Sequence, residues 1–514
     1  MSFTRIKRTF LDFIEYLSKS IVSYPPIQKW LKEHPKLIDQ IQKRLTPKRF
    51  KGLPLTLLLA ALLFSLYLFL GIAADYLTHD PLISVDVRLA NLLFAFRSQH
   101  LLRFFYAVTL FAESWVVITA AILLTVLLRF YKQRIHILAL WLALISSEGA
   151  TYVGKLLFHR GRPDLLLRAV SEDSFSFPSG HATTVAVFYG FLAYLIIRHS
   201  KSWKVRIGVV SSTIITIILV DLSRLYLGVH FLSDVLAGNL IGFSGLLFGM
   251  TVSEWFISSG LFKPSTKFRS SMIAWVLIYE ILMIIVMVHF APLTWQPTKP
   301  PQAQTISTKE VLSLFETGKL PRYTETLLGT PQEPTNLIVI APEQCFNDDI
   351  EKAGWILADS VSLQSVKHIS KTALLNTEYP TAPITPSFYA ERPHDLGFEK
   401  ETDRKTVRAR HHVRFWKTGF ATPDGLLYVG TVSLDTGIKW GITHQIAPDI
   451  DTERDLFVSD LRQVNSLTQE QKILFIPPIL GKNFSGDEFF TDGKTEFLTL
   501  APCREYPPFK NLER

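Results

Sequence analysis

Seven apolar runs fill most of the chain between residues 53 and 290, and each approaches the roughly 20 residues that a helix needs to cross a bilayer. A shorter apolar stretch, residues 101–111, cannot cross alone, and we expect it to extend the second helix or to lie at the membrane interface. The pattern predicts an all-α transmembrane bundle with spans near residues 53–76, 113–131, 135–157, 182–197, 207–222, 232–252 and 272–290.

Basic residues in the short loops between these runs predict the orientation of the bundle. Loops around residues 129–134, 198–206 and 263–269 are rich in Lys and Arg, and seven spans place them on one side with the basic residues 1–52. Such loops stay in the cytoplasm, so everything after residue 290 is expected on the periplasmic side of an inner (plasma) membrane. Residues 1–52 hold 12 Lys and Arg against four acids, which fits either an interfacial helix or a solvated tail.

The second half of the chain has the pattern of a soluble domain. Residues 292–304 contain four prolines and predict a semi-rigid linker. Beyond it, short β-type runs at 337–340, 426–432 and 472–476 occur with helical stretches at 308–315 and 348–358, which predicts an α+β domain. The expected organisation is a basic cytoplasmic tail (1–52), a membrane domain (53–255), a cytoplasmic loop with the seventh span (256–291), the linker (292–304) and the soluble domain (305–514).

Composition and charge narrow the class of protein. The 514 residues are 48% hydrophobic and only 19% charged, which is typical of a membrane protein. The net charge of +9 divides into +15 over residues 1–299 and −6 over residues 300–514. The positive charge therefore belongs mostly to membrane loops, and a nucleic-acid binder is disfavoured. With two cysteines and no zinc-type cluster, we expect no metal and no other cofactor.

Three polar clusters stand at the ends of apolar runs, on the side opposite the basic loops. They read Lys155-x6-Arg162-Pro163, Pro178-Ser179-Gly180-His181 and Ser223-Arg224-x5-His230-x3-Asp234. Cations at membrane ends need an anionic partner, and a phosphate with several charged oxygens suits Lys155, Arg162 and Arg224. Ser179 and Gly180 precede a helix, whose free N–H groups and positive dipole end also favour phosphate. The clusters together predict a phosphate-binding site.

The two histidines of these clusters predict the chemistry. His230 has Asp234 four residues further on, so a carboxylate could hold the tautomer of the imidazole and stabilise its positive charge. This arrangement suits a nitrogen nucleophile. His181, at the start of a helix beside the phosphate site, is suited to protonate a departing oxygen. Because cations can neutralise the developing charge, a metal ion is not required.

These three motifs, in this order, resemble the signature of the type 2 phosphatidic acid phosphatase (PAP2) superfamily of membrane lipid phosphatases over about residues 50–255. The resemblance implies a six-helix core, to which the chain adds a seventh span, a phosphohistidine intermediate and no metal cofactor. By the same resemblance the nucleophile is His230, with Asp234 orienting it and His181 as the general acid. The residues that it assigns to phosphate binding are Lys155, Arg162, Ser179, Gly180 and Arg224.

The implied function is hydrolysis of a lipid phosphate or diphosphate at the periplasmic face. Substrates that the family suggests are undecaprenyl diphosphate, phosphatidic acid, phosphatidylglycerol phosphate and lipid A phosphates. Two alternatives remain open: phosphotransfer to an acceptor other than water, and a membrane-anchored binding or assembly module of the cell envelope. The motifs recognise the phosphate and therefore cannot separate the lipid tails.

Three acids lie inside or near the spans, where a charge is costly. We expect Asp221, one turn from Arg224, to pair with a basic residue. Glu148 and Glu280 are expected to face the bundle interior as hydrogen-bonding structural groups rather than to take part in catalysis.

The soluble half resembles the LssY-type C-terminal domain over roughly residues 330–465, a resemblance that carries no settled activity. Its imidazoles and carboxylates could bind a metal, or its His and Arg residues could bind phosphate, a polysaccharide or a protein partner. The segment 410–416 equally fits a surface strand with one apolar face. Outside the cytoplasm, Cys345 and Cys503 could form a disulfide. The candidate ligands are His411, His412, His444, Asp449, Asp451 and Asp455.

Overall fold

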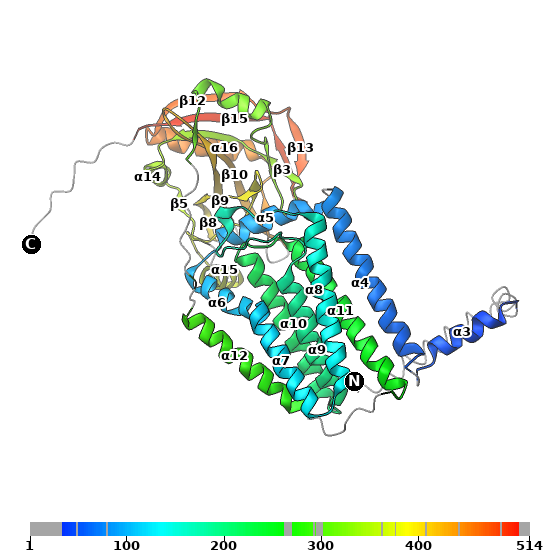
Figure 1. Cartoon of the computed structure of the whole chain (residues 1–514). Helices are drawn as coiled ribbons and strands as arrows, with labels where there is room; N and C mark the ends of the chain where they lie inside the picture. The colour runs from blue at the N-terminus through cyan, green and yellow to red at the C-terminus, as the bar shows by residue number, and fades with distance from the viewer. Residues whose placement is uncertain are drawn as a thin grey trace, which may run out of the picture.

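The computed structural model describes residues 33–47, 50–78, 81–261, 270–290, 293, 302–360, 363–375, 377–406, 409–439, 443–483 and 486–502. Within them, the chain forms a bundle of long helices with a β-rich domain over one end of it (Figure 1). The basic tail enters the description only with α3 (Pro35–Leu45). Residues 1–32 and 48–49 of the predicted tail and most of the predicted linker lie outside the described residues.

The apolar runs form the helices of the bundle. Six described helices are long and apolar enough to cross a membrane, and a bent pair, Gln99–Ala112 and Ser114–Phe130, makes a seventh if it is counted as one span. The two parts of this pair meet at 43°, and the stretch at 101–111 is helical, so whether it extends the second span or lies at the interface stays a prediction. The helices are α4 (Leu53–Thr78), α5 (Pro81–Ala95), α6 (Gln99–Thr109), η1 (Leu110–Ala112), α7 (Ser114–Phe130), α8 (Arg134–Phe158), η2 (Leu165–Leu167), α9 (Gly180–His199), α10 (Trp203–Tyr226), α11 (Leu232–Ser258), η3 (Ser270–Met272) and α12 (Ile273–Phe290).

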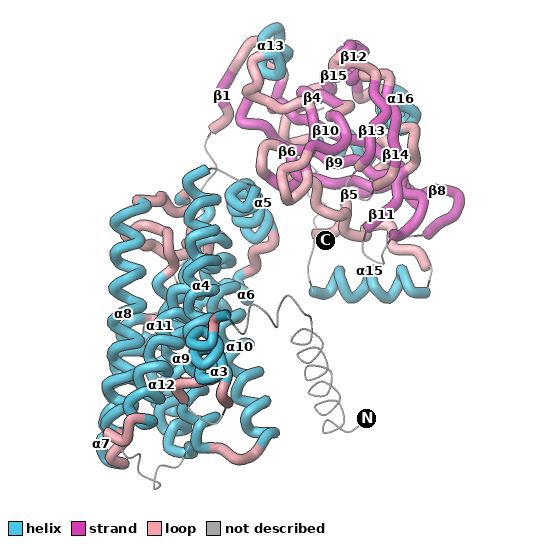
Figure 2. Tube along the Cα trace, turned by 90° about the vertical axis from the view of Figure 1, so that its right-hand side faces the viewer, coloured by secondary structure: helices cyan, strands magenta, loops and turns pink. Residues whose placement is uncertain are grey.

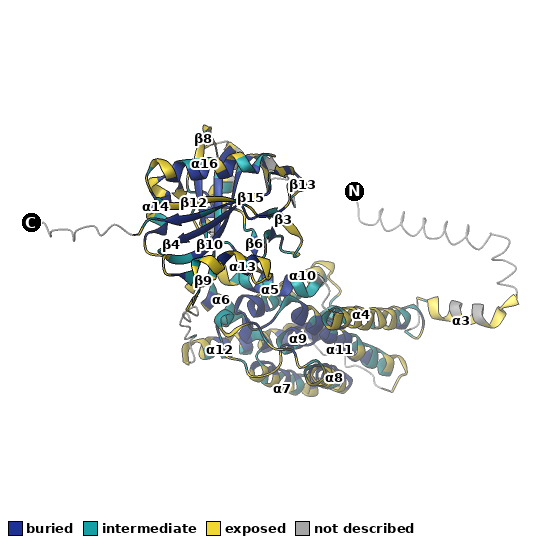
Figure 3. Ribbon diagram, turned by 90° about the horizontal axis from the view of Figure 1, so that it is seen from above, coloured by how far each residue is buried: buried dark blue, intermediate teal, exposed yellow. Residues whose placement is uncertain are grey.

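Helix α9 is the centre of the bundle and is the most buried of the spans (Figure 3). Helix α11 packs closely against it because glycines occupy the contact. A Cβ at Gly238 would lie 2.4 Å from the carbonyl oxygen of Ser179, and one at Gly242 would lie 2.5 Å from that of Thr183. Small residues four apart let two membrane helices approach at backbone distance. This packing places the first turn of α11 beside the first turn of α9.

Helix α5 was not predicted as an element. Its 15 residues are too few to span a bilayer, and Asp86 and Arg88 interrupt its apolar sequence. It lies across the end of the bundle, between the membrane helices and the β-rich domain (Figure 1).

The C-terminal domain is built on a mixed sheet with the strand order β12-β15-β4-β10-β9-β8-β5, to which β1 and β11 add at β9 and β10. Strand β4 pairs parallel with β15 and antiparallel with β10. A second sheet has the order β3-β2-β6-β7, and β13 pairs with β14. The strands are β1 (Gln304–Thr305), β2 (Tyr323–Glu325), β3 (Pro331–Pro334), β4 (Leu337–Ala341), β5 (Ile356–Leu357), β6 (Phe388–Tyr389), β7 (Arg392–Pro393), β8 (Leu396–Thr406), β9 (Ala409–Thr422), β10 (Gly425–Lys439), β11 (Thr443–Ile446), β12 (Leu467–Leu474), β13 (Ile479–Lys482), β14 (Glu488–Thr491) and β15 (Lys494–Leu500).

Helices cover both faces of the large sheet. One face packs with α14 and α16 around Trp355 and Phe457, and the other packs with α13 and the second sheet around Trp416. The predicted β-type runs at 337–340 and 426–432 lie within β4 and β10, whereas the run at 472–476 overlaps only the end of β12. The soluble half is rich in β-sheet (Figure 2). The helices and the 3-10 turn of this domain are η4 (Thr308–Glu310), α13 (Val311–Glu316), α14 (Phe346–Lys352), α15 (Leu363–Leu375) and α16 (Ile450–Gln463).

The motif-bearing ends of the helices lie at the same end of the bundle as the C-terminal domain. Helix α8 leads toward this end and α9 leads away from it, while the basic connections α7–α8 and α9–α10 lie at the opposite end (Figure 1). The predicted separation of motifs from basic loops is therefore seen in the structure.

Candidate active site

All eight residues that the sequence singled out gather at this end of the bundle. Lys155 stands in the last turn of α8 and Arg224 in the last turn of α10, so both face the loops beyond the helices. Arg162 and His230 lie in those loops. The other four residues lie at the starts of two helices. Ser179, Gly180 and His181 stand at the start of α9, and Asp234 is in the first turn of α11.

The three cations surround one short segment of the loop between α8 and α9. The carboxylate of Glu172 accepts a hydrogen bond from Nη2 of Arg224 at 2.5 Å and lies 3.5 Å from Nη2 of Arg162. Ser174 links the other pair, because its Oγ accepts from Nζ of Lys155 at 2.9 Å and from Nη2 of Arg162 at 3.0 Å. An anionic group thus already sits among the cations, which is what a phosphate-binding site requires.

Glu172 is held as a carboxylate. Burial alone would raise its pKa, but the charges of Arg224 and Arg162 and the hydrogen bond from Arg224 outweigh burial and lower the pKa to about 2. The same charges would stabilise a phosphate in its place. Glu172 was not predicted as a site residue. The feature of the sequence that could have indicated it is the acidic pair Glu172 and Asp173, which lies between two basic motifs.

The start of α9 adds backbone groups to the site. Ser179 caps the helix by accepting from the N–H of Ala182 at 3.5 Å, and its own N–H donates to the carbonyl of Asp234 at 2.9 Å. A Cβ placed on Gly180 would meet no described heavy atom within 4 Å. The glycine is therefore not required by packing, and the first turn of α9 has open space on that side.

His230 is oriented by two neighbours. Its Nδ1 lies 3.4 Å from Oδ2 of Asp234, and its Nε2 lies 3.2 Å from Nη1 of Arg162. Asp234 therefore favours the tautomer with the proton on Nδ1, which leaves the lone pair of Nε2 directed toward the cations. Contrary to the helical spacing considered for this pair, only Asp234 is in a helix, and His230 reaches it from the preceding turn.

The surroundings of His230 keep its imidazole neutral. Burial lowers its pKa well below the usual value, and the charges of Arg224, Arg162 and Lys155 lower it further. A neutral ring without a proton on Nε2 is the nucleophilic form of histidine, and in the structure this nitrogen faces Nη1 of Arg162.

His181 has a carboxylate partner that was not predicted. Its Nε2 lies 3.6 Å from Oε2 of Glu113, which stands at the bend between η1 and α7. Each histidine of the site therefore has a carboxylate near one ring nitrogen, Asp234 beside His230 and Glu113 beside His181.

A second layer of charges supports Asp234. Arg160, between the first motif's Lys155 and Arg162, donates to Oδ1 of Asp234 at 2.7 Å and to Oδ2 of Asp86 at 2.7 Å. Neither Arg160 nor Asp86 was assigned a role from the sequence. The position of Arg160 inside the first motif could have indicated its role. No pattern in the sequence of α5 indicates that Asp86 contacts a residue 74 positions away.

The three acids of the spans are polar contacts of the bundle. Asp221 was expected to pair with a basic residue, and this is wrong: its Oδ2 accepts from the side-chain amide of Asn239 at 2.7 Å. Arg224, one turn away, instead binds Glu172. Glu280 is buried and accepts from Tyr189, as expected. Glu148 accepts from Thr184 but is exposed, so the expectation that it faces the bundle interior is wrong.

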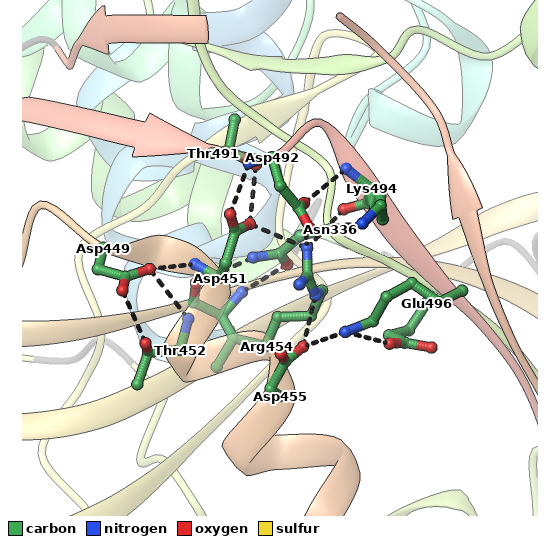
Figure 4. Close-up of polar contacts among 12 residues, drawn as sticks. Asn336, Asp449, Asp451, Thr452, Arg454, Asp455, Thr491, Asp492, Lys494 and Glu496 are labelled. Carbon is green, nitrogen blue, oxygen red and sulfur yellow. Dashed lines mark hydrogen bonds and ion pairs between the residues drawn. The ribbon is translucent and has the colours of Figure 1, made fainter. Parts of the chain in front are cut away.

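In the C-terminal domain, the candidate ligands do not form a metal site among the described residues, where no group of three or more His, Cys, Asp or Glu could hold an ion. The Asp residues instead tie α16 to neighbouring strands (Figure 4). Asp449 caps α16, Asp451 binds Arg454 and Thr491, and Asp455 binds Arg454 and Lys472.

The segment 410–416 is not a surface strand. It belongs to β9, which lies between β8 and β10 within the large sheet. His412 is buried and lies 2.8 Å from Ser433 and 3.2 Å from Asp435, while His411 lies 2.6 Å from Glu453. The side chain of His444 and all of Cys503 lie outside the described residues, so the pairing of Cys345 with Cys503 stays a prediction.

The apolar helices are those of a multi-pass membrane protein, and comparison with known proteins agrees. The sequence profile of the PAP2 superfamily matches residues 136–258, and that of the LssY C-terminus matches residues 317–495. The chain is 30% identical to phosphatidylglycerophosphatase B of Bacillus subtilis over 209 residues, which are 40% of this chain and 97% of that protein. The chain belongs to the PAP2 superfamily and carries an LssY C-terminal domain.

Two further proteins are similar to the membrane half. Undecaprenyl-diphosphatase of Sulfolobus acidocaldarius is 33% identical over 131 residues, which are 25% of this chain and 58% of that protein. The crystal structure of a PAP2-type phosphatidylglycerolphosphate phosphatase from Bacillus subtilis has 28% sequence identity and a TM-score of 0.34, covering 41% of this chain and 98% of that one. The homologues are membrane lipid phosphatases.

Proposed function

We propose that this protein is an integral membrane phosphatase that hydrolyses a lipid phosphate or diphosphate through a phosphohistidine intermediate on His230. The observation that carries the proposal is the position of Nε2 of His230. It lies 3.2 Å from Arg162, and Arg162 shares the carboxylate of Glu172 with Arg224. A phosphate that replaced this carboxylate would face the lone pair of the imidazole.

In the first step, Nε2 of His230 attacks phosphorus and the bond to the lipid oxygen breaks. His181 donates a proton to that oxygen, so the lipid leaves as an alcohol, or as a lipid monophosphate when the substrate is a diphosphate. Asp234 stabilises the positive charge that forms on the imidazole, and Lys155, Arg162 and Arg224 stabilise the charge on the phosphoryl oxygens.

In the second step, water attacks the phosphohistidine. His181, now neutral, accepts a proton from that water, and the P–N bond breaks to return neutral His230 and inorganic phosphate. The N–H groups at the start of α9, from Gly180 onward, bind phosphate oxygens in both steps. The protein groups alone neutralise the charge in this scheme, so we expect the reaction to need no metal ion.

We place the reaction at the periplasmic face of the inner membrane. The support is the distribution of charge: Lys and Arg concentrate in the connections α7–α8 and α9–α10, at the end of the bundle away from the site. Such loops are retained in the cytoplasm. The C-terminal domain, at the same end as the site, is then periplasmic as well.

The phosphate-binding residues do not distinguish one lipid tail from another. Phosphatidylglycerol phosphate, undecaprenyl diphosphate, phosphatidic acid and lipid A phosphates are therefore candidate substrates, and two of the similar proteins bear the names of activities on the first two. All four carry a phosphate or diphosphate on a lipid anchored in the bilayer.

Phosphate release by the detergent-purified full-length protein tests the proposal. The panel contains these four lipids, with His230→Ala as the inactive variant and His289→Ala, an exposed residue at the C-terminal end of α12, as a matched histidine control. We expect release by the wild type and the control and none by His230→Ala. With a substrate labelled on phosphorus, acid-labile label should remain on the wild-type protein after quenching. Full activity of His230→Ala would exclude the mechanism.

A further inference from the structure

Helix α5 presents two faces with different partners. Asp86, Leu89 and Leu93 follow one another at helical spacing and face the phosphatase bundle, where the two leucines pack beside Ala182, Leu225 and Val235. Residues 84, 88 and 91 repeat at the same spacing on another side of the helix, and their side chains bond to the C-terminal domain. One helix of four turns therefore contacts both halves of the chain.

The inner face fixes Arg160. The carboxylate of Asp86 accepts from Nη2 of Arg160 at 2.7 Å and from the backbone N–H of Ser233 at 3.0 Å, and Ser233 Oγ donates to it at 2.5 Å. All three side chains are buried. The guanidinium of Arg160 also lies over the rings of Tyr76 and Phe231, at 4.9 and 4.4 Å from their centroids.

Arg160 in turn fixes the acid that orients the proposed nucleophile. Its Nη1 donates to Oδ1 of Asp234 at 2.7 Å, while Oδ2 of Asp234 accepts from the N–H of Phe231 at 2.8 Å and lies 3.4 Å from Nδ1 of His230. Because Oδ1 of Asp234 is bound to Arg160, Oδ2 is directed toward His230. A chain of contacts thus runs from α5 to the imidazole.

The outer face of α5 is held by the C-terminal domain. Arg88, which is almost fully buried, donates to Oε2 of Glu325 in β2 at 2.6 Å. Ser84 donates to the carbonyl of Leu328 at 3.2 Å, and the side-chain amide of Asn91 donates to the carbonyl of Glu391 at 3.0 Å. The turn after β2 approaches so closely that a Cβ at Gly329, where φ is +80°, would lie 3.1 Å from the guanidinium of Arg88.

We propose that the C-terminal domain braces the active site through α5, with Asp86 and Arg160 as positioning residues for Asp234 and His230. This inference rests on the proposed phosphatase function. It gives the C-terminal domain a role in the reaction without contact to the substrate: the domain holds α5 in place, α5 holds Arg160, and Arg160 sets the carboxylate beside the imidazole.

Residues that position a catalytic group have measurable effects on activity. Residues that orient a ligand or catalytic group from one layer behind it typically change activity by about 10- to 100-fold when they are replaced. Residues that act through a further element have smaller effects, of the order of about 3- to 10-fold. We therefore expect kcat to fall about 10- to 100-fold in Asp86→Asn and about 3- to 10-fold in Glu325→Gln, with KM nearly unchanged because neither residue touches the phosphate.

Double variants separate positioning from general destabilisation. If Asp86 acts through Asp234, then Asp86→Asn should cost little further activity in a protein that already carries Asp234→Asn, because the oriented group is gone. If Asp86 merely stabilises the fold, the two losses multiply. Asp86→Glu, which keeps the charge, should recover part of the activity.

A charge exchange tests the brace itself. Arg88→Glu places two carboxylates together and should lower kcat more than Glu325→Gln does, while the double variant Arg88→Glu with Glu325→Arg restores an ion pair and should return most of the activity. Glu470→Gln is the matched control, because Glu470 pairs with Arg462 at 2.6 Å on the surface of the same domain. That variant should keep the wild-type rate.

Amide hydrogen exchange gives a readout that does not depend on turnover. In full-length Glu325→Gln, peptides that cover α5 and residues 228–236 should exchange faster than in the wild type, and they should not change in Glu470→Gln. Unchanged exchange together with wild-type kcat in Arg88→Glu would overturn the brace. If the wild type released no phosphate from any lipid, the proposed function would fail, and the exchange experiment would still decide whether the domain holds α5.

Discussion

The carboxylate of Glu172 lies 2.5 Å from Nη2 of Arg224, in the place where the proposed mechanism puts a phosphate oxygen. The carboxylate and a phosphate oxygen cannot occupy the same place beside Nη2, so binding of phosphate there requires Glu172 to move away. The pKa of Glu172, about 2, keeps it charged at every pH at which the protein would work.

Removal of this charge should strengthen substrate binding. In Glu172→Gln the neutral amide competes less well for Arg224 and Arg162, so we expect KM for a lipid phosphate to fall about 3- to 10-fold, as when a competing state is removed. Inorganic phosphate should inhibit this variant at correspondingly lower concentration. Asp173→Asn, at the neighbouring exposed position, is the control. An unchanged or raised KM in Glu172→Gln would show that the carboxylate does not compete.

The pH profile should report the depressed pKa of His230. The neutral ring is required for attack, and protonation removes the lone pair of Nε2. Since burial and three cations hold the pKa well below 6.5, the neutral form persists to lower pH, and the acid limb of kcat/KM should lie below pH 6.5.

The phosphate of the substrate also titrates near pH 6 and contributes its own acid limb to the pH profile. This limb must be separated from the limb of His230. Asp234→Asn removes the carboxylate that favours imidazolium and should move only the limb of His230, to still lower pH. A limb at pH 6.5 or above that moves in this variant would contradict the assignment.

Loss of one cation should be severe. Arg224→Ala removes a guanidinium that faces the phosphoryl oxygens, and loss of one such donor costs about 100- to 1,000-fold in kcat. Arg206→Ala, in the first turn of α10 at the far end of the bundle, is the matched control and should stay near the wild-type rate. Comparable activity of the two variants in a phosphate-release assay would remove Arg224 from the site.

The glycine contact between α9 and α11 should be sensitive to a single methyl group. In Gly242→Ala the new Cβ would lie 2.5 Å from the carbonyl of Thr183, so α11 must shift, at a cost of about 1–3 kcal/mol in stability. Thermal unfolding in detergent should show a lowered midpoint. Gly208→Ala, where the added carbon meets nothing within 4 Å, should unfold like the wild type.

The sequence was sufficient to predict the spans and the placement of the eight candidate residues at one end of the bundle, because both depend on local patterns. Length and apolar character identify a span, and the spacing within each motif brings Lys155 and Arg162, or His230 and Asp234, to the same helix end. The motifs meet because consecutive helices run in opposite directions.

Contacts between distant segments could not be predicted in this way. The contact of Asp86 with Arg160 and that of Asp221 with Asn239 depend on how whole helices pack. Neither pair can be predicted from a spacing in the sequence. Helix α5 was not predicted because it is too short to span a bilayer and because its two charged residues are typical of a loop. The burial of β9 likewise depends on which strands flank it, and alternation alone cannot distinguish a central strand from one at the surface.

The ion pair between Arg88 and Glu325 joins residues 237 positions apart in sequence. During synthesis, α5 and every motif leave the ribosome well before β2 does, so this contact can close only after the C-terminal domain has been made and has folded. A chain interrupted before that moment would hold all the catalytic groups without the contact. Maturation of the enzyme would then have a fixed order, in which competence to cleave lipids comes last.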